Sequence, residues 1–146
     1  MRKDGIILIA EDNEGHFELI RKNLLRAGIC NEMLHFADGQ ETLDFLFKMS
    51  KKPEQERNNQ EYILLLDIRI PKVGGFKVLE KIKQDTELKK IPVIILTVVD
   101  APHAIERCHN LGCSTYIVKP TKYEDFEETV QKIGRFLSVI EIASLK

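Results

Sequence analysis

Short apolar runs alternate with stretches of helical periodicity along the whole chain. The run at residues 6–10 is continuously apolar, as expected for a strand that is covered on both faces. Similar runs predict further strands at residues 33–36, 62–66, 92–96 and 116–118. Apolar residues at helical spacing predict helices at residues 14–27, 40–49, 76–82 and 102–111, and a long last helix from residue 126 to about 140–146. Gly28 stands where the first helix needs a left-handed residue to end.

Five strands and five helices in strict alternation predict an α/β fold, a doubly wound parallel sheet with helices on both faces. The pattern predicts a single domain over residues 1–146, without internal repeats. One connection is unusually long: residues 50–61 are polar and are expected to form a surface loop.

Composition narrows the possible functions. The 146 residues include 43% hydrophobic and 31% charged side chains, which is typical of a folded globular protein. Lys and Arg number 22 against 23 Asp and Glu, and this balance removes the electrostatic case for binding nucleic acid or an anionic membrane. No apolar run approaches the ~20 residues that a membrane span needs. Three cysteines without C-x-x-C spacing, and no secretory leader, favour a reducing, cytoplasmic location.

Polar side chains follow four of the predicted strands. They are Glu11 and Asp12 after the first strand, Asp67 after the third, Thr97 after the fourth and Lys119 after the fifth. In an open α/β sheet the carboxyl ends of the strands form the site, so these residues should meet at one edge. Three clustered carboxylates repel one another, and a hard divalent cation such as Mg²⁺ would compensate them.

This set of groups suits phosphoryl transfer. A carboxylate at Asp67 can attack phosphorus, the Lys119 ammonium can neutralise phosphoryl oxygens, and the Thr97 hydroxyl can donate a hydrogen bond to them. Each residue alone has an ordinary interpretation as a helix cap, a turn residue or a surface lysine. Five suitable residues at four strand ends are much harder to explain in that way.

The surrounding motifs resemble the receiver domain of bacterial two-component response regulators over nearly the full length. The resemblance rests on Glu11-Asp12-Asn13 after the first strand, on Leu-Asp67 through Gly75, on Ile-Leu-Thr97, and on Tyr116-Ile-Val-Lys119-Pro120. It implies a flavodoxin-like fold with strand order 2-1-3-4-5.

The resemblance also implies roles for individual residues. Asp67 would accept a phosphoryl group from a histidine kinase or phosphotransfer protein. Mg²⁺ would be bound by Asp12, Asp67 and the backbone carbonyl of Arg69, with Glu11 acting largely through water. Thr97 and Tyr116 would form a switch pair, and the Lys119–Pro120 peptide would be cis.

The output expected for such a stand-alone regulator is binding to a downstream protein or passing the phosphoryl group onward. A homodimer could form through the face made by the helix at 102–111, the strand at 116–118 and the last helix. Val98 stands where the family often has Ala or Ser and could narrow access to the phosphoryl group, while Arg69 and Val99 occupy positions expected to tune its lifetime. The long 50–61 segment is most similar to the small regulators associated with bacterial phytochromes.

Two other functions compete with that of a phosphorylated receiver. A docking module that needs no phosphorylation would be expected to have lost Asp67, Lys119 or the acidic pair, and all are intact. A Mg²⁺-dependent phosphatase would need a general acid two residues after Asp67, where Arg69 stands.

Three further features carry ordinary interpretations. His16 could help to hold metal or contact a kinase, but a solvent-facing ring is favoured. Cys108-His109 and Cys113 lack a full zinc ligand set, so Cys108 is expected in the core. The pair Gly74–Gly75 is interpreted as a flexible turn, because no Gly-Lys-Ser/Thr follows it.

Overall fold

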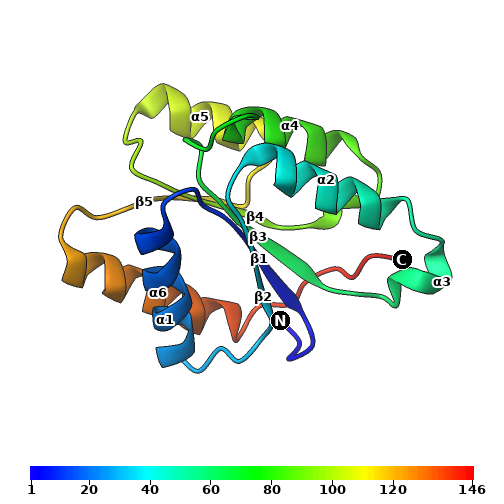
Figure 1. The fold of residues 1–146 in the computed structure, drawn as a ribbon, viewed down its shortest axis with the longest axis horizontal. Coiled ribbons are helices and arrows are strands. Elements are labelled where there is room, and N and C mark those ends of the chain that lie inside the picture. Colours follow the sequence, from blue (N-terminus) through cyan, green and yellow to red (C-terminus); the bar gives the residue numbers. More distant parts are fainter.

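The computed structural model describes residues 1–146 and shows a five-stranded, all-parallel sheet in the order β2-β1-β3-β4-β5. The strands are β1 (Ile6–Ala10), β2 (Met33–Phe36), β3 (Tyr62–Leu66), β4 (Val93–Thr97) and β5 (Thr115–Val118). Helices α2 (Gly39–Ser50), α4 (Gly75–Gln84) and α5 (Pro102–Leu111) cover one face, and α1 (Glu14–Arg26) and α6 (Tyr123–Leu137) cover the other (Figure 1). The predicted doubly wound α/β fold and its strand order are therefore confirmed.

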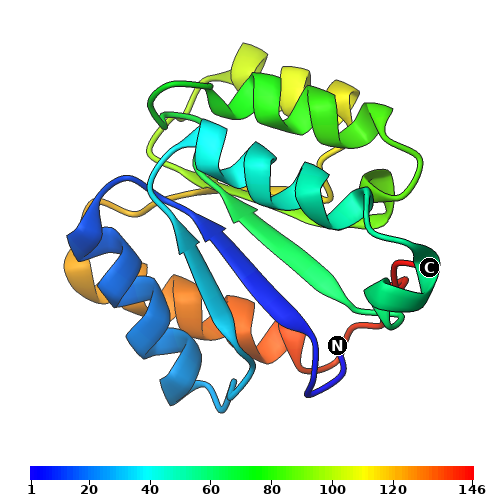
Figure 2. The same cartoon turned by 45° about the vertical axis from the view of Figure 1, so that its right-hand side comes forward.

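Side chains alternate between the two faces of the central strands and so build two separate cores. On β1, Leu8 and Ala10 pack under α2 and α4, whereas Ile7 and Ile9 pack under α1 and α6. Because both faces are covered, β3 and β4 are buried at every position, which explains their uninterrupted apolar sequence. Figure 2 shows the sheet between the two helical layers.

The helices end where the sequence indicates. Gly28, just after α1, and Gly112, after α5, have φ of 91° and 101°, a left-handed conformation that glycine adopts without steric cost. The side chains of Asn13 and Asp38 cap α1 and α2 by accepting hydrogen bonds from backbone N–H groups of the first turn.

The 50–61 connection lies at the surface, as expected, but it contains a sixth helix that the sequence analysis did not predict. This short helix is α3 (Glu54–Arg57), and it follows Pro53, whose fixed φ favours a helix start. Asn58 ends α3 in the left-handed conformation. A short 3₁₀ turn, η1 (Leu88–Lys90), precedes β4.

The expectation of a last helix reaching about 140–146 is wrong. Helix α6 ends at Leu137, and residues 138–146 form a non-helical tail that runs toward α3 (Figures 1 and 2). Ile140 and Ile142 pack against the core under α1 and α6, whereas Leu145 is buried in the opposite core. The Leu145 N–H donates to the carbonyl of Gln60 at 2.9 Å. The apolar residues of the tail thus pack against both cores in turn. A straight continuation of α6 could not follow this path.

No helix of this structure combines the length and the apolar character that crossing a membrane requires.

Candidate functional site

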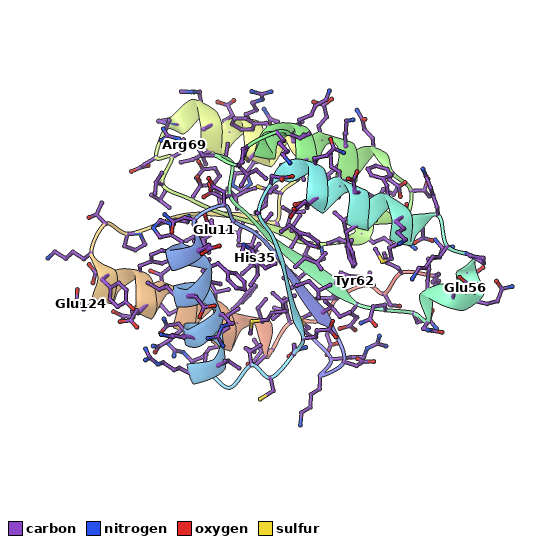
Figure 3. The ribbon with its side chains drawn as sticks, viewed as in Figure 1. Glu11, His35, Glu56, Tyr62, Arg69 and Glu124 are labelled. Atoms are coloured by element: carbon purple, nitrogen blue, oxygen red, sulfur yellow. The ribbon has the colours of Figure 1, made fainter.

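The predicted site residues meet at the carboxyl edge of the sheet because the strands are in register. Ala10 pairs with Leu66, so Glu11 and Asp67 leave neighbouring strands side by side. Thr97 pairs with Val118 at the end of β5, and the Lys119 N–H donates to the Thr97 carbonyl at 2.7 Å. Figure 3 shows Glu11 and Arg69 toward this edge, far from Glu56 on α3.

Lys119 joins the two buried carboxylates. Its Nζ donates to Glu11 Oε1 and, at 2.8 Å, to Asp67 Oδ2. The side chain of Lys119 is 2% exposed, so the ammonium is desolvated and depends on these partners. A lysine that bridges two acids at a sheet edge supplies a fixed positive charge beside Asp67.

The Lys119–Pro120 peptide is trans, since the chain has no cis peptide bond, and the expected cis bond is wrong. With the trans peptide the Lys119 side chain reaches both carboxylates, and its backbone is held at the end of β5 by the hydrogen bond to Thr97.

Asp67 is held on both carboxylate oxygens. While Oδ2 accepts from Lys119, Oδ1 accepts from the Arg69 N–H at 3.0 Å, and the residue is 5% exposed. The side chain of Arg69 points away into solvent, as its exposure shows. Asp67 therefore sits in a turn whose backbone fixes the carboxylate, with a cation on the other oxygen.

Two glycines pack the loop that follows Asp67 tightly against its surroundings. A Cβ at Gly75 would lie 2.5 Å from the Cα of Ile68, and one at Gly39 would lie 1.8 Å from the Val73 carbonyl oxygen. The Gly75 N–H also donates to the Ile68 carbonyl at 2.9 Å. Gly75 is thus a close-approach position that starts α4, and the interpretation of Gly74–Gly75 as a flexible turn is wrong for Gly75.

Glu11, Asp12 and Asp67 form an acidic cluster whose carboxylate oxygens lie within 4.8 Å of one another. Glu11 is buried, and burial raises the pKa of its carboxyl, partly offset by the hydrogen bond and charge of Lys119. Asp12 is exposed at the mouth of the cluster. Three oxygen donors with a single buried cation between them have the chemistry that a hard divalent ion prefers.

Thr97 and Tyr116 lie on neighbouring strands beside this cluster. Thr97 is fully buried, and its Oγ1 accepts a long 3.5 Å hydrogen bond from the Val99 N–H. The Tyr116 hydroxyl donates to the Val99 carbonyl at 2.6 Å. Partial burial is the main cause that raises the pKa of Tyr116 to about 12, so the hydroxyl stays a donor at neutral pH. Val98, between these contacts, is 48% exposed.

A family model described as the response regulator receiver domain matches residues 7–131. The chain belongs to this family. The receiver is similar to the response regulator Rcp1 of Synechocystis, at 30% identity over 90% of this chain and 87% of that one. It is also similar to a probable methanogenesis regulatory protein, FilR2, of Methanothrix harundinacea, at 34% identity over 90% of this chain and 82% of that one.

Solved structures show the same architecture. A receiver domain from Rhodospirillum rubrum superimposes with a TM-score of 0.89 at 35% identity, over 97% of this chain and 99% of that one. The phosphorylated cyanobacterial phytochrome response regulator RcpA gives a TM-score of 0.83 at 28% identity, over 95% and 98%. The resemblance to regulators associated with phytochromes is confirmed at the level of these relatives.

Two histidines contact this receiver's site in ways that the sequence analysis missed. His16 was expected to face solvent, but it is half-buried, with Nδ1 3.0 Å from Lys119 Nζ. His35 on β2 contacts the Glu11 carbonyl through Nε2 at 2.7 Å and stacks on Phe17 with ring centroids 3.8 Å apart. His16 lies in the first turn of α1, four positions after Asp12, and this closeness to the acidic pair is the signal that could have placed it near the same sheet edge.

The cysteines lie outside the receiver's site. Cys108 is fully buried in the core under α4 and α5, as predicted, and burial raises its pKa to about 11. Cys113 Sγ lies 3.8 Å from His109 Nδ1. One thiol and one imidazole make an incomplete metal ligand set, so the structure supports core packing.

Proposed function

We propose that this receiver is a phosphorylation-dependent signalling switch in which Asp67 accepts a phosphoryl group from a histidine kinase or a phosphotransfer protein. In this step a carboxylate oxygen of Asp67 forms a bond to phosphorus while the bond from phosphorus to the donor's imidazole nitrogen breaks. The electron pair of the broken bond stays on the donor imidazole. The chemistry concerns only the receiver's own side chain, as in a signalling domain and unlike an enzyme that turns over external substrates.

The position of Asp67 carries this proposal. Its carboxylate is nearly buried, yet both oxygens are fixed, one by the backbone N–H of Arg69 and one by Lys119. Phosphoryl transfer depends mainly on positioning and on stabilising charge, and this arrangement supplies both. Lys119 would transfer its hydrogen bond from Asp67 to a phosphoryl oxygen, and the buried Thr97 hydroxyl lies on the adjacent strand to add another.

We propose Mg²⁺ as the cofactor, held by Asp12, Asp67 and the carbonyl of Arg69, with Glu11 bound through water. The cluster of three carboxylates supports this, and a similar solved structure is described as the Mn²⁺-bound form of Rcp1. When bound, the ion would neutralise charge on the incoming phosphoryl group. Asp12 is the exposed member of the cluster and so is free to turn toward a cation, whereas both Glu11 oxygens accept hydrogen bonds.

The readout is proposed to run through Thr97 and Tyr116. If Thr97 moves toward the phosphoryl group, the β4–α5 connection shifts and the bond from Tyr116 to Val99 must break or follow. The ring could then turn inward, changing the face of α5, β5 and α6 that a downstream protein would bind. This is a population shift between two packings, driven by a new local charge.

A second copy of the chain could bind the same face. Phe136 on α6 and Val139 just after it are 52% and 75% exposed, and an apolar groove of about 370 Å³ lies between β5 and α6. Light scattering on the chain with and without phosphorylation, compared with Phe136→Asp, tests this dimer. A monomer mass in all samples would contradict it.

The decisive experiment is incubation with Mg²⁺ and acetyl phosphate, followed by intact-mass measurement. We expect one acid-stable, base-labile phosphoryl adduct that is absent in Asp67→Asn and greatly reduced in Asp12→Asn. Asp100→Asn, on the exposed β4–α5 connection, is the matched control and should behave like the wild type.

Other outcomes favour the rival functions. No adduct on the wild-type chain would favour a docking module that needs no phosphorylation, and steady hydrolysis of other phosphomonoesters would favour a phosphatase.

We place the receiver in the cytoplasm, and its three unpaired cysteines support a reducing compartment.

A further inference from the structure

The ammonium group of Lys119 has three N–H donors and three acceptors around it. Two acceptors are the carboxylates of Glu11 and Asp67, and the third is His16 Nδ1, 3.0 Å from Nζ. With a side chain that is 2% exposed, Lys119 relies on protein groups to satisfy its donors. His16 therefore completes the coordination of a buried charge.

The imidazole of His16 is fixed from two sides. Asn13 Oδ1 accepts the His16 backbone N–H at 3.0 Å and so sets the first turn of α1. Phe126 of α6 packs edge-to-face on the ring, with centroids 5.4 Å apart and planes at 82°. The ring is thus held between α1 and α6 in an orientation that aims Nδ1 at Lys119.

We propose that His16 is a positioning residue that holds Lys119 in place for the phosphorylation of Asp67. The inference rests on the proposed function, because the lysine matters only if a phosphoryl group arrives. Of the three acceptors, Asp67 is converted to an acyl phosphate and Glu11 belongs to the cation cluster. His16 is the one acceptor whose bonding is unchanged by either event, so it keeps the ammonium aimed at the reacting carboxylate.

The role requires a neutral imidazole, because a protonated Nδ1 cannot accept a hydrogen bond. The charged groups that act on the ring are Lys119, which lies in contact with it, and the carboxylates of Asp12 and Asp67. Burial and the Lys119 charge lower the pKa of His16, and the two carboxylates oppose this effect. The ring is therefore neutral at pH 7, and its protonation in acid would remove the hydrogen bond from Lys119 to Nδ1.

Two substitutions separate positioning from simple packing. His16→Asn retains an acceptor near the position of Nδ1 and does not titrate, whereas His16→Leu keeps apolar bulk but has no acceptor. With acetyl phosphate and Mg²⁺ at pH 7.5, we expect His16→Leu to be phosphorylated about tenfold more slowly than the wild type, the value of one lost hydrogen bond to a charged group. His16→Asn should stay within about threefold of the wild type.

The pH profile gives a second readout. Because the pKa of His16 is lowered, its protonation should begin only below the ordinary imidazole value of 6.5. In that acid range the wild-type rate should decline relative to that of His16→Asn, and changes of the phosphoryl donor cancel in this ratio. His103→Asn, on the exposed face of α5, is the control and should follow the wild type at every pH. Equal rates for His16→Leu and the wild type, or equally slow rates for both His16 variants, would overturn the positioning role.

A titration by NMR tests the contact without any phosphorylation. Replacing Lys119 by Met removes the cation beside the ring, so the pKa of His16 should rise relative to the wild type. An unchanged pKa would show that the ring does not contact the lysine in solution, and the inference would fail. A wild-type chain that takes up no phosphoryl group would instead count against the proposed function, which keeps the two failures distinguishable.

Discussion

The hydroxyl of Tyr116 donates a 2.6 Å hydrogen bond to the carbonyl of Val99, which ties β5 to the connection between β4 and α5. This bond joins the strand that precedes Lys119 to the segment that follows Thr97. If phosphorylation moves Thr97 as proposed, we expect this contact to carry the movement to the outer face.

Removing this bond should weaken the link between β5 and the β4–α5 connection and leave the surroundings of Asp67 unchanged. We expect Tyr116→Phe to lower the free energy of unfolding by about 0.5–1.5 kcal/mol, the net value of one hydrogen bond, while the rate of phosphorylation stays within about twofold. Urea unfolding and the acetyl phosphate assay measure the two quantities. Tyr123→Phe, at a 59% exposed position, is the control that should change neither.

The same tyrosine makes stability depend on high pH. The pKa of Tyr116 is raised to about 12 in the folded chain, above the ordinary value of 10, so folding favours the protonated hydroxyl. Its contribution to stability is complete below pH 10 and is lost as pH rises toward 12. Urea unfolding between these values should therefore show a steeper loss for the wild type than for Tyr116→Phe. Parallel curves would contradict the assignment.

Lys119→Met should destabilise the chain because it leaves Glu11 and Asp67 buried without their cation. We expect a loss of about 3 kcal/mol at pH 7, measured by urea unfolding. Burial already raises the pKa of Glu11, so acid protonates this carboxyl readily and the gap from the wild type should narrow as pH falls toward 5. Added Mg²⁺ should narrow the gap too. Lys132→Met, with a 67% exposed side chain, should cost little at any pH.

Adjacent glycines offer a matched test of packing around the Asp67 loop. Gly75→Ala places a Cβ 2.5 Å from the Cα of Ile68 and should cost at least ~2 kcal/mol of stability. Gly74→Ala meets nothing within 4 Å and has a negative φ, so its effect should stay within about 1 kcal/mol. Equal effects in urea unfolding would show that the loop adapts to the added methyl group.

The tail can be tested in the same way. Leu145 is 1% exposed, and we expect Leu145→Ala to lower the free energy of unfolding by about 2 kcal/mol and to speed proteolysis after residue 137. Val139→Ala, at a 75% exposed position of the same tail, should have almost no effect. Reversed results would mean that the tail docks in a different register.

The fold could be predicted because its signals are local. The last four residues of the apolar run Ile6–Ala10 are buried by helices on both sides, and Gly28 and Gly112 mark the helix ends by backbone sterics alone. The tail shows where such signals stop. Ile140 and Ile142 continue an apolar pattern that suits a helix, but the chain is not helical there, and the Leu145 N–H instead donates to the distant carbonyl of Gln60.

The site residues show the same contrast between local signals and contacts distant in the sequence. Glu11, Asp67, Thr97 and Lys119 could be placed together because each directly follows or ends a strand, and parallel strands bring such positions to one edge. His16 follows no strand, and its partner Lys119 lies 103 positions away in the sequence, so its role depends on how α1 packs over the sheet. The cis peptide before Pro120 was expected from the resemblance alone, and the structure has the trans form that most X-Pro bonds adopt.

The two sides of Asp67 differ in mechanical stiffness. Toward α4, backbone lies against backbone at Gly75 and Gly39, where not even a methyl group fits. Such close packing leaves no space into which the loop after Asp67 could move. Toward α5, the exposed segment around Val98 is held by a long bond to Thr97 and by the hydroxyl of Tyr116. We therefore expect a displacement that starts at Asp67 to be taken up by the segment around Val98 and not by the packed backbone at Gly75 and Gly39. On this expectation, the difference in packing sets the direction of the movement before any partner binds.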